Sequence, residues 1–219
     1  TGSVDSTGAV SSNDEALYAE VPATPTQSLS DTGSSGAKLT LPILVYHIVR
    51  PNYPDDSASV RTFALTPEIF DAEMKYLADA GYHVVPMSAL ENYFQNGRPL
   101  PRRPIIITFD DGWGSQFLYA FPILKKYHYT ATFFVFTNPI GTKGFLTWDE
   151  LETMRNAGMT IGSHTRSHPY LARIADPILL WNEINGSKLT LEKRLGTTVN
   201  EFAYPFGQYD AAIVAMVEK

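Results

Sequence analysis

Two adjacent carboxylates and two histidines four residues apart are the side chains of this sequence best suited to chemistry. Asp110 and Asp111 lie in the stretch TFDDGW, and His164 and His168 lie in SHTRSH. One carboxylate of such a pair can bind a metal ion while its neighbour accepts a proton from a bound water. Imidazoles spaced by four lie on the same side of a helical turn, which suits a shared cation. Together they predict a metal site with open positions for water and substrate.

Each pair also has a structural interpretation when it is taken alone. Asp111-Gly112 fits a solvated turn, because Asp-Gly is a common turn pair. Two histidines spaced by four are more often surface or structural residues than metal ligands. The metal interpretation is favoured only if the fold brings the two segments to one place.

The elements around these segments indicate a fold that does so. Apolar runs of three to six residues predict strands over 42–46, 83–85, 105–109, 131–136, 160–162 and 201–204. Between them, Thr66-Pro67 and Asp176-Pro177 begin helices, and Ser88 with Glu91 and Thr147 with Glu150 read as capping boxes. Alternating strands and helices predict an α/β fold with a mostly parallel sheet or barrel.

The candidate segments share one position in these elements. Asp110, His164 and the stretch AYPFG (203–207) lie at or just after the carboxyl end of a predicted strand, as does His47 in LVYH. In a parallel barrel the carboxyl ends of the strands meet at one mouth, which is where such enzymes hold their active sites. We therefore expect the four segments to lie together.

Composition sets the limits of the prediction. The 219 residues include no cysteine, which excludes disulfides, thiolate zinc sites and cysteine nucleophiles. The net charge of −6 and the lack of a basic run argue against a nucleic-acid partner, and no apolar run is long enough for a transmembrane segment. Residues 1–38 are rich in Ser, Thr, Gly, Pro and Asp and are predicted to be a flexible polar tether before a folded domain over 39–219.

The motifs TFDDG, HTRSH and AYPFG resemble those of the NodB-type polysaccharide deacetylases, carbohydrate esterase family 4, over about residues 40–219. The resemblance implies a distorted (β/α)7-8 TIM-like barrel, of which only about six strands are countable here, so truncation at the C-terminus is expected. It also implies a divalent metal, foremost Zn²⁺ with Co²⁺, Ni²⁺ or Fe²⁺ as alternatives. Asp110 would be the catalytic base, and Asp111, His164 and His168 the metal ligands.

Two departures from the family pattern bear on catalysis. Many members have Arg at the position of Ala203, where it pairs with the base, and many carry a late Leu-x-His motif that supplies the general acid. No histidine follows His168 in this chain. Circularly permuted members, which act on poly-β-1,6-N-acetylglucosamine, instead begin with P-[IV]-L-x-Y-H, as Pro42–His47 does, and have an aromatic residue after TFDDG. We therefore predict His47 as the general acid.

The resemblance implies hydrolysis of N-acetyl groups on a polysaccharide outside the cell or at its surface, with poly-β-1,6-N-acetylglucosamine as the first candidate. Peptidoglycan, chitin or xylan are alternative substrates, and a carbohydrate-binding module without turnover is an alternative of another class. The oligomeric state stays open. The expected substrate-binding residues are the following: Trp113, Tyr204, Pro205, Phe206 and Gly207.

Overall fold

The computed structural model describes residues 39–219, and the predicted tether over 1–38 lies outside the described residues. Residues Thr40–Lys219 form one compact unit. Its strands are β1 (Ile43–Tyr46), β2 (Ile48–Val49), β3 (Ala64–Leu65), β4 (His83–Val84), β5 (Pro104–Phe109), β6 (Thr132–Val135) and β7 (Thr160–Ser163). Its α-helices are α1 (Ala58–Phe63), α2 (Pro67–Asp79), α3 (Met87–Asn96), α4 (Phe121–Lys126), α5 (Trp148–Asn156), α6 (Pro177–Leu195) and α7 (Ala211–Val217).

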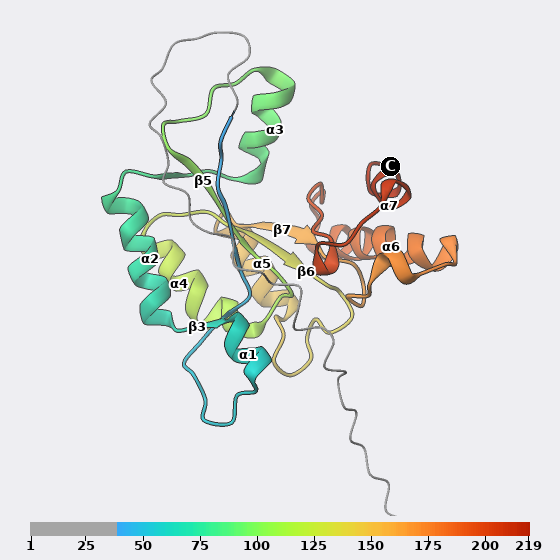
Figure 1. The fold of residues 1–219 in the computed structure, drawn as a ribbon, viewed down its shortest axis with the longest axis horizontal. Coiled ribbons are helices and arrows are strands. Elements are labelled where there is room, and N and C mark those ends of the chain that lie inside the picture. Colours follow the sequence, from blue (N-terminus) through green and yellow to red (C-terminus); the bar gives the residue numbers. More distant parts are fainter. Residues whose placement is uncertain (1–38) are drawn as a thin grey trace, which may run out of the picture. The chain divides into compact units, whose positions relative to one another are not determined.

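Five of the strands form one sheet in which every pairing is parallel (Figure 1). Its order is β1-β5-β6-β7, and β4 pairs with the first two residues of β5. Strands β2 and β3 form a separate parallel pair, and α1 lies between them in the sequence. This is the parallel α/β architecture that the sequence predicts. In the part of the chain that the structure describes, the seven strands are divided between a sheet of five and a pair.

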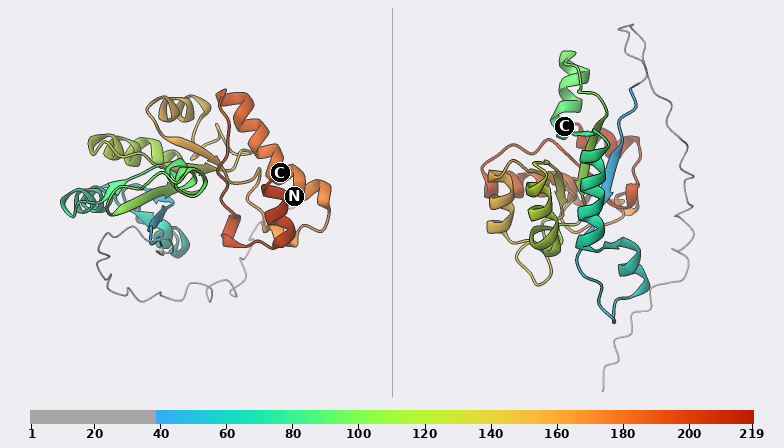
Figure 2. Two further views of the ribbon diagram at one scale, coloured as in Figure 1. Left: turned by 90° about the horizontal axis from the view of Figure 1, so that it is seen from above. Right: turned by 90° about the vertical axis from the view of Figure 1, so that its left-hand side faces the viewer.

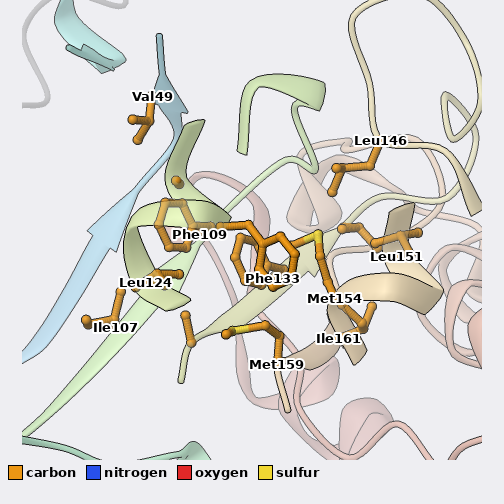
Figure 3. Close-up of a cluster of buried hydrophobic side chains, with 14 of the residues drawn as sticks. Val49, Ile107, Phe109, Leu124, Phe133, Leu146, Leu151, Met154, Met159 and Ile161 are labelled. Carbon is orange, nitrogen blue, oxygen red and sulfur yellow. The ribbon is translucent and has the colours of Figure 1, made fainter. Parts of the chain in front are cut away.

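The core lies between one face of this sheet and four helices. Alternate residues of β5, among them Ile107 and Phe109, point toward α2 and α4, and their neighbours along the strand point to the opposite face. Phe109 stacks on Phe133 of β6 with ring centroids 4.6 Å apart, and Met154 and Met159 lie close to this pair (Figure 3). The helices α2, α4, α5 and α6 follow one another around the sheet (Figure 2), and each contributes buried side chains to this core.

Local signals explain most helix boundaries. Thr66 caps α2 with its hydroxyl, and Pro67 occupies the first turn, where its missing N–H is not needed. The predicted capping box of Thr147 and Glu150 is present at α5. The predicted box of Ser88 and Glu91 is wrong: α3 begins at Met87, after Pro86, and has no side-chain cap. Pro86 has an extended backbone and is the N-cap, so the helix starts two residues earlier than an N-cap at Ser88 implies.

The predicted last strand is shorter than expected. Residues 201–204 form only a single parallel bridge, between Phe202 and Ser163, and Pro205–Gly207 then form a 3₁₀ turn. Pro205 has no N–H to continue the ladder, which explains why it stops there. Within residues 39–219, no helix is both long and apolar enough to cross a membrane.

Candidate metal centre and its surroundings

The three principal site segments begin where three parallel strands of the same sheet end. His47 follows β1, Asp110 follows β5 and His164 follows β7. The register pairs Tyr46 with Phe109, so His47 and Asp110 leave adjacent strands at the same level. The carboxyl edge of the sheet therefore collects side chains from positions 47, 110 and 164, which is the arrangement that the sequence predicts.

Three of the predicted residues form a donor cluster of the kind that binds a metal ion. One ligand atom from each of Asp111, His164 and His168 lies within 4.8 Å of the others. The Oδ1 atom of Asp111 is 3.6 Å from Nε2 of His164 and 3.4 Å from Nε2 of His168. Two imidazoles and one carboxylate are a donor set found in catalytic zinc sites.

The cluster is oriented by surrounding groups. The Nδ1 atom of His164 lies 2.9 Å from the carbonyl oxygen of Ala203. Because a carbonyl only accepts, Nδ1 carries the proton and Nε2 presents a lone pair to the cluster. The indole Nε1 of Trp113 donates to Oδ2 of Asp111 at 3.0 Å, which leaves Oδ1 facing the histidines. Burial lowers the pKa of both imidazoles, so they are neutral and ready to bind a cation at neutral pH.

The loop that carries the two histidines is not helical, contrary to the interpretation of their spacing. Thr165 and His168 both have a positive φ, of 71° and 59°. The Thr165 hydroxyl accepts from the backbone N–H of His168 at 3.0 Å. Glu183 of α6 accepts from the backbone N–H groups of Arg166 and Ser167, at 3.0 and 2.9 Å. The loop is thus fastened by side chains, and the rings of His164 and His168 have centroids 4.7 Å apart.

Asp110 has different surroundings from those of Asp111. Burial, followed by the negative charge of Asp111, raises the pKa of Asp110 to about 7. Within residues 39–219, no hydrogen bond or ion pair joins its carboxylate to another residue. Ala203 occupies the position where an arginine was expected to pair with the base, and it contributes its backbone carbonyl to His164 instead.

His47 lies beside this cluster. Burial lowers the pKa of its imidazole, an effect that the carboxylate of Asp111 opposes and the ring of His168 reinforces. Its ring is 4.9 Å from that of Phe63, at the end of α1. His47 is therefore close enough to Asp111 and His168 for their charges to affect its pKa.

Aromatic rings surround the cluster, but the predicted substrate-binding residues are not all placed alike. Trp113 stacks on Phe145, with ring centroids 4.8 Å apart. Phe206, 44% exposed, stacks on Tyr170 at 3.8 Å and lies 4.6 Å from the ring of His168. The ring of Tyr204 contacts Phe202 and Tyr209 instead. It packs against a second cluster of buried side chains, formed by Leu171, Leu180, Ile184 and Ile213. Pro205 is buried, and Gly207 has a φ of 63°.

Three residues of this region were not found from the sequence. Gln116 is fully buried and donates to the backbone carbonyls of His47 and Asp110. Glu183 holds the histidine loop, and Phe145 packs on Trp113. The spacing of Gln116 from Ala120 and Leu124, which places a polar side chain on a buried face, was a signal for the first of them.

The chain is similar in sequence to known proteins. The sequence model of the polysaccharide deacetylase family matches residues 97–219, more than half of the chain. YxkH of Bacillus subtilis is 32% identical over 180 residues, which cover 82% of this chain and 61% of that protein. The poly-β-1,6-N-acetyl-D-glucosamine N-deacetylase of Staphylococcus epidermidis is 27% identical over 185 residues, which cover 75% of this chain and 64% of that protein. The chain thus spans about six tenths of the length of these two relatives.

Solved structures show the same architecture. The Streptococcus pyogenes deacetylase PplD, in complex with acetate, superimposes with a TM-score of 0.75 at 28% identity, covering 81% of this chain and 79% of that one. IcaB from Ammonifex degensii gives a TM-score of 0.72 at 26% identity with the same coverage.

Proposed function

This chain belongs to the polysaccharide deacetylase family, and we propose that it hydrolyses N-acetyl groups on a polysaccharide with the help of a divalent metal ion. One observation carries the proposal. The donor atoms of Asp111, His164 and His168 lie within 4.8 Å of one another, directly beside the carboxylate of Asp110.

The residues present fit a cation. Asp111 Oδ1 and the Nε2 atoms of the two histidines would hold it, and the His164 Nε2 lone pair is fixed by the bond from Nδ1 to Ala203. When bound, a divalent cation there supplies a Lewis acid for an acetyl carbonyl and lowers the pKa of a water molecule. We propose Zn²⁺, which suits two imidazoles and one carboxylate, with Co²⁺, Ni²⁺ or Fe²⁺ as substitutes.

Asp110 and His47 would move the protons of the reaction. Asp110, with a pKa raised to about 7, accepts a proton from the attacking water near neutral pH. His47 would give a proton to the departing nitrogen; the lowered pKa of its imidazole makes the protonated form a stronger acid and also a smaller fraction of the protein at neutral pH. The C–N bond breaks, and the products are acetate and a free amine on the sugar.

The aromatic residues at the mouth would contact the sugar rings. Trp113 and Phe206 are partly exposed beside the metal cluster, where a ring face can stack on a pyranose. Pro205 and Gly207 would fix the backbone of the turn that carries Phe206, and Tyr204 would anchor this turn by packing against buried side chains. The backbone N–H of Phe206 is the candidate for holding the oxyanion, because the N–H of Gly207 already donates to the carbonyl of Tyr204.

We propose poly-β-1,6-N-acetylglucosamine as the substrate, supported by the name of the Staphylococcus epidermidis relative. The acetate bound in the related PplD structure is the product expected of a deacetylase. We further propose that the catalytic domain begins near residue 39, which the compact unit from Thr40 supports, and that it acts outside the cell or at its surface.

Acetate release tests the function directly. We expect the protein to release acetate from poly-β-1,6-N-acetylglucosamine faster than from a chitin oligomer, to stop when a chelator is added, and to recover with Zn²⁺ or Co²⁺. Faster release from the chitin oligomer or from peptidoglycan would reassign the substrate and keep the reaction. Binding of one metal equivalent without acetate release from any of these polymers would contradict the proposal and favour a carbohydrate-binding module.

A further inference from the structure

Gln116 occupies an unusual place next to the proposed acid and base. It begins the π-helical turn Gln116–Ala120 that follows the DDGW segment, and its side chain is fully buried. Its Nε2 atom lies 2.9 Å from the carbonyl oxygen of His47 and 2.6 Å from that of Asp110. Single π-helical turns of this kind are frequent at functional sites.

The chemistry of these contacts fixes the orientation of the amide. Both partners are backbone carbonyl oxygens, which only accept hydrogen bonds, so the atom that faces them must be the NH₂ group. Both of its hydrogens are used, one for each carbonyl. Gln116 is thereby the link between the residue that follows β1 and the residue that follows β5.

The hydrogen bonds of Gln116 join β1 and β5 just beyond the last backbone hydrogen bond between these strands. The strands pair as far as Tyr46 and Phe109, and the N–H of Asp110 donates to the carbonyl of Tyr46 at 2.9 Å. Beyond this bond, the two segments that follow β1 and β5 are joined by the Gln116 amide, which donates to the carbonyl oxygens of His47 and Asp110. The backbone positions of the proposed acid and base are therefore set by one side chain.

Gln116 leaves one of its own polar atoms unpaired. The Oε1 atom of Gln116 is buried and has no hydrogen-bond partner among the residues that the structure describes. An apolar side chain of similar length would remove this unpaired acceptor, but it would also take the donor away from the carbonyl oxygens of His47 and Asp110. The amide is thus more than a space-filling group at this position.

We propose that Gln116 is a positioning residue for the deacetylation proposed above, on which this inference rests, and that it sets the separation between His47 and Asp110. Proton transfer to and from a reacting group depends on distances of about 3 Å, and a displacement of about 1 Å can reduce the rate a hundredfold. The side chain of Gln116 forms no hydrogen bond with the metal donors, Trp113 or Phe206 within residues 39–219, and its backbone N–H donates to the carbonyl of Trp113, a bond that does not involve the side chain. It should therefore affect turnover without affecting metal or substrate binding.

The test compares two variants of Gln116 with a matched control. Gln116→Met keeps the length and removes both donors, and Gln116→Glu keeps the shape while replacing the NH₂ group by oxygen. For both we expect kcat for acetate release to fall about tenfold to a hundredfold, while KM stays within about twofold and one equivalent of Zn²⁺ binds with unchanged affinity. Gln95→Met, on an exposed position of α3, should leave all three quantities unchanged.

The outcomes separate this inference from the function on which it rests. An unchanged kcat in a folded, metal-loaded Gln116→Met protein overturns the positioning role and leaves the deacetylase proposal intact. Equal losses in metal affinity and kcat, or failure of both variants to fold, would make Gln116 a general structural residue and also overturn it. If the unaltered protein releases no acetate from any polymer, the proposed function itself fails, and the inference fails with it.

Discussion

Asp110 and Asp111 are neighbours in the chain, but their surroundings prepare them for different work. Asp111 has a positive φ of 73°, receives a hydrogen bond from Trp113, and turns Oδ1 toward the two histidines. Asp110 is partly buried without a side-chain partner among the described residues, and its pKa rises to about 7. Two carboxylates whose environments differ in this way are a common basis for separate ligand and base roles.

Replacing Asp110 tests the base role. Asp110→Asn keeps the shape and removes the proton acceptor, so we expect acetate release to fall by about a hundredfold or more while Zn²⁺ binding is retained. Steady-state kinetics and metal titration on the same preparation check both quantities. Asp55→Asn, at an exposed loop position, is the control and should be as active as the unaltered protein. Full activity in Asp110→Asn would exclude Asp110 as the base.

His47 makes a second residue-scale prediction. If its imidazole supplies the proton to the leaving amine, His47→Ala should bind one equivalent of Zn²⁺ normally and turn over about a hundredfold more slowly. Isothermal titration with Zn²⁺ and acetate release measure the two effects separately. Loss of metal binding in His47→Ala would instead identify His47 as a ligand. His83→Ala, outside the site segments, serves as the matched control.

At the scale of the element, two capping signals of the same sequence type have different outcomes. Thr147 caps α5, and its hydroxyl accepts from the N–H of Glu150, whereas Ser88 lies inside α3 without a side-chain cap. Thr147→Ala should lower the free energy of unfolding by about 1 kcal/mol, and Ser88→Ala should change it by less than about 0.5 kcal/mol. Urea unfolding of the two variants checks this, and equal effects would contradict the assigned start of α3.

The histidine loop depends on an element that comes later in the chain. Glu183 of α6 accepts three hydrogen bonds from this loop, one of them from the Ser167 hydroxyl at 2.7 Å. Glu183→Gln replaces one accepting oxygen by a donor that faces other donors, so the loop should loosen and Zn²⁺ affinity should fall about tenfold. Metal titration measures it. Glu152→Gln on the exposed face of α5 should have no effect, and a Glu183→Gln protein with unchanged affinity would show that the loop holds itself.

The sequence indicated where strands end but not how the chain turns after them. Strands β1, β5 and β7 were predicted within two residues of their bounds, because short apolar runs between helical patterns are a strong local signal. Thr165 and His168 adopt positive φ values that nothing in their residue types requires. Their conformation comes from long-range partners such as Glu183, which a reading of local spacing cannot supply. The spacing of four thus pointed to two histidines that do lie together, but for a helical conformation that the structure does not show.

At the scale of the whole molecule, the site contains several features that oppose stability. Four of the six non-glycine residues with positive φ in the described part of the chain lie in site segments: Asp111, Thr165, His168 and Phe206. Asp110 is buried with a carboxylate that resists ionisation, and Gln116 has an unpartnered oxygen. Strained conformations persist only where the surrounding structure holds them in place. Here Phe109, the residue before Asp110, is held by stacking on Phe133.

A bound metal should offset part of this strain. A ligand that binds only the folded protein stabilises it by about 2.7 kcal/mol at a concentration one hundred times its Kd. We therefore expect Zn²⁺ to raise the unfolding temperature of the unaltered protein by several degrees and a chelator to reverse the change. His164→Ala should remove the shift, whereas His83→Ala should keep it. A shift of equal size in both variants would place the stabilising metal elsewhere.

The burial of Asp110 has a consequence for stability that depends on pH. With its pKa raised from about 4 to about 7, the folded protein keeps a proton that the unfolded chain releases between these values. Over this range the unfolded state binds fewer protons, so stability falls as pH rises. In Asp110→Asn this loss is absent. With chelator present, the variant should exceed the unaltered protein in free energy of unfolding by about 1–3 kcal/mol at pH 8, since each pKa unit corresponds to about 1.4 kcal/mol.

Urea unfolding at pH 8 and at about pH 4 measures the difference. The gap between Asp110→Asn and the unaltered protein should narrow toward the lower pH, where the carboxyl group is protonated in the folded state and about half protonated in the unfolded state. A gap of the same size at both pH values would reflect packing rather than ionisation. No gap at either pH would mean that Asp110 is solvated in the folded protein, and its suitability as a base near neutral pH would then need another origin. Asp110→Asn is thus expected to lose turnover and to gain stability at pH 8 for the same reason, which is the removal of the Asp110 carboxylate.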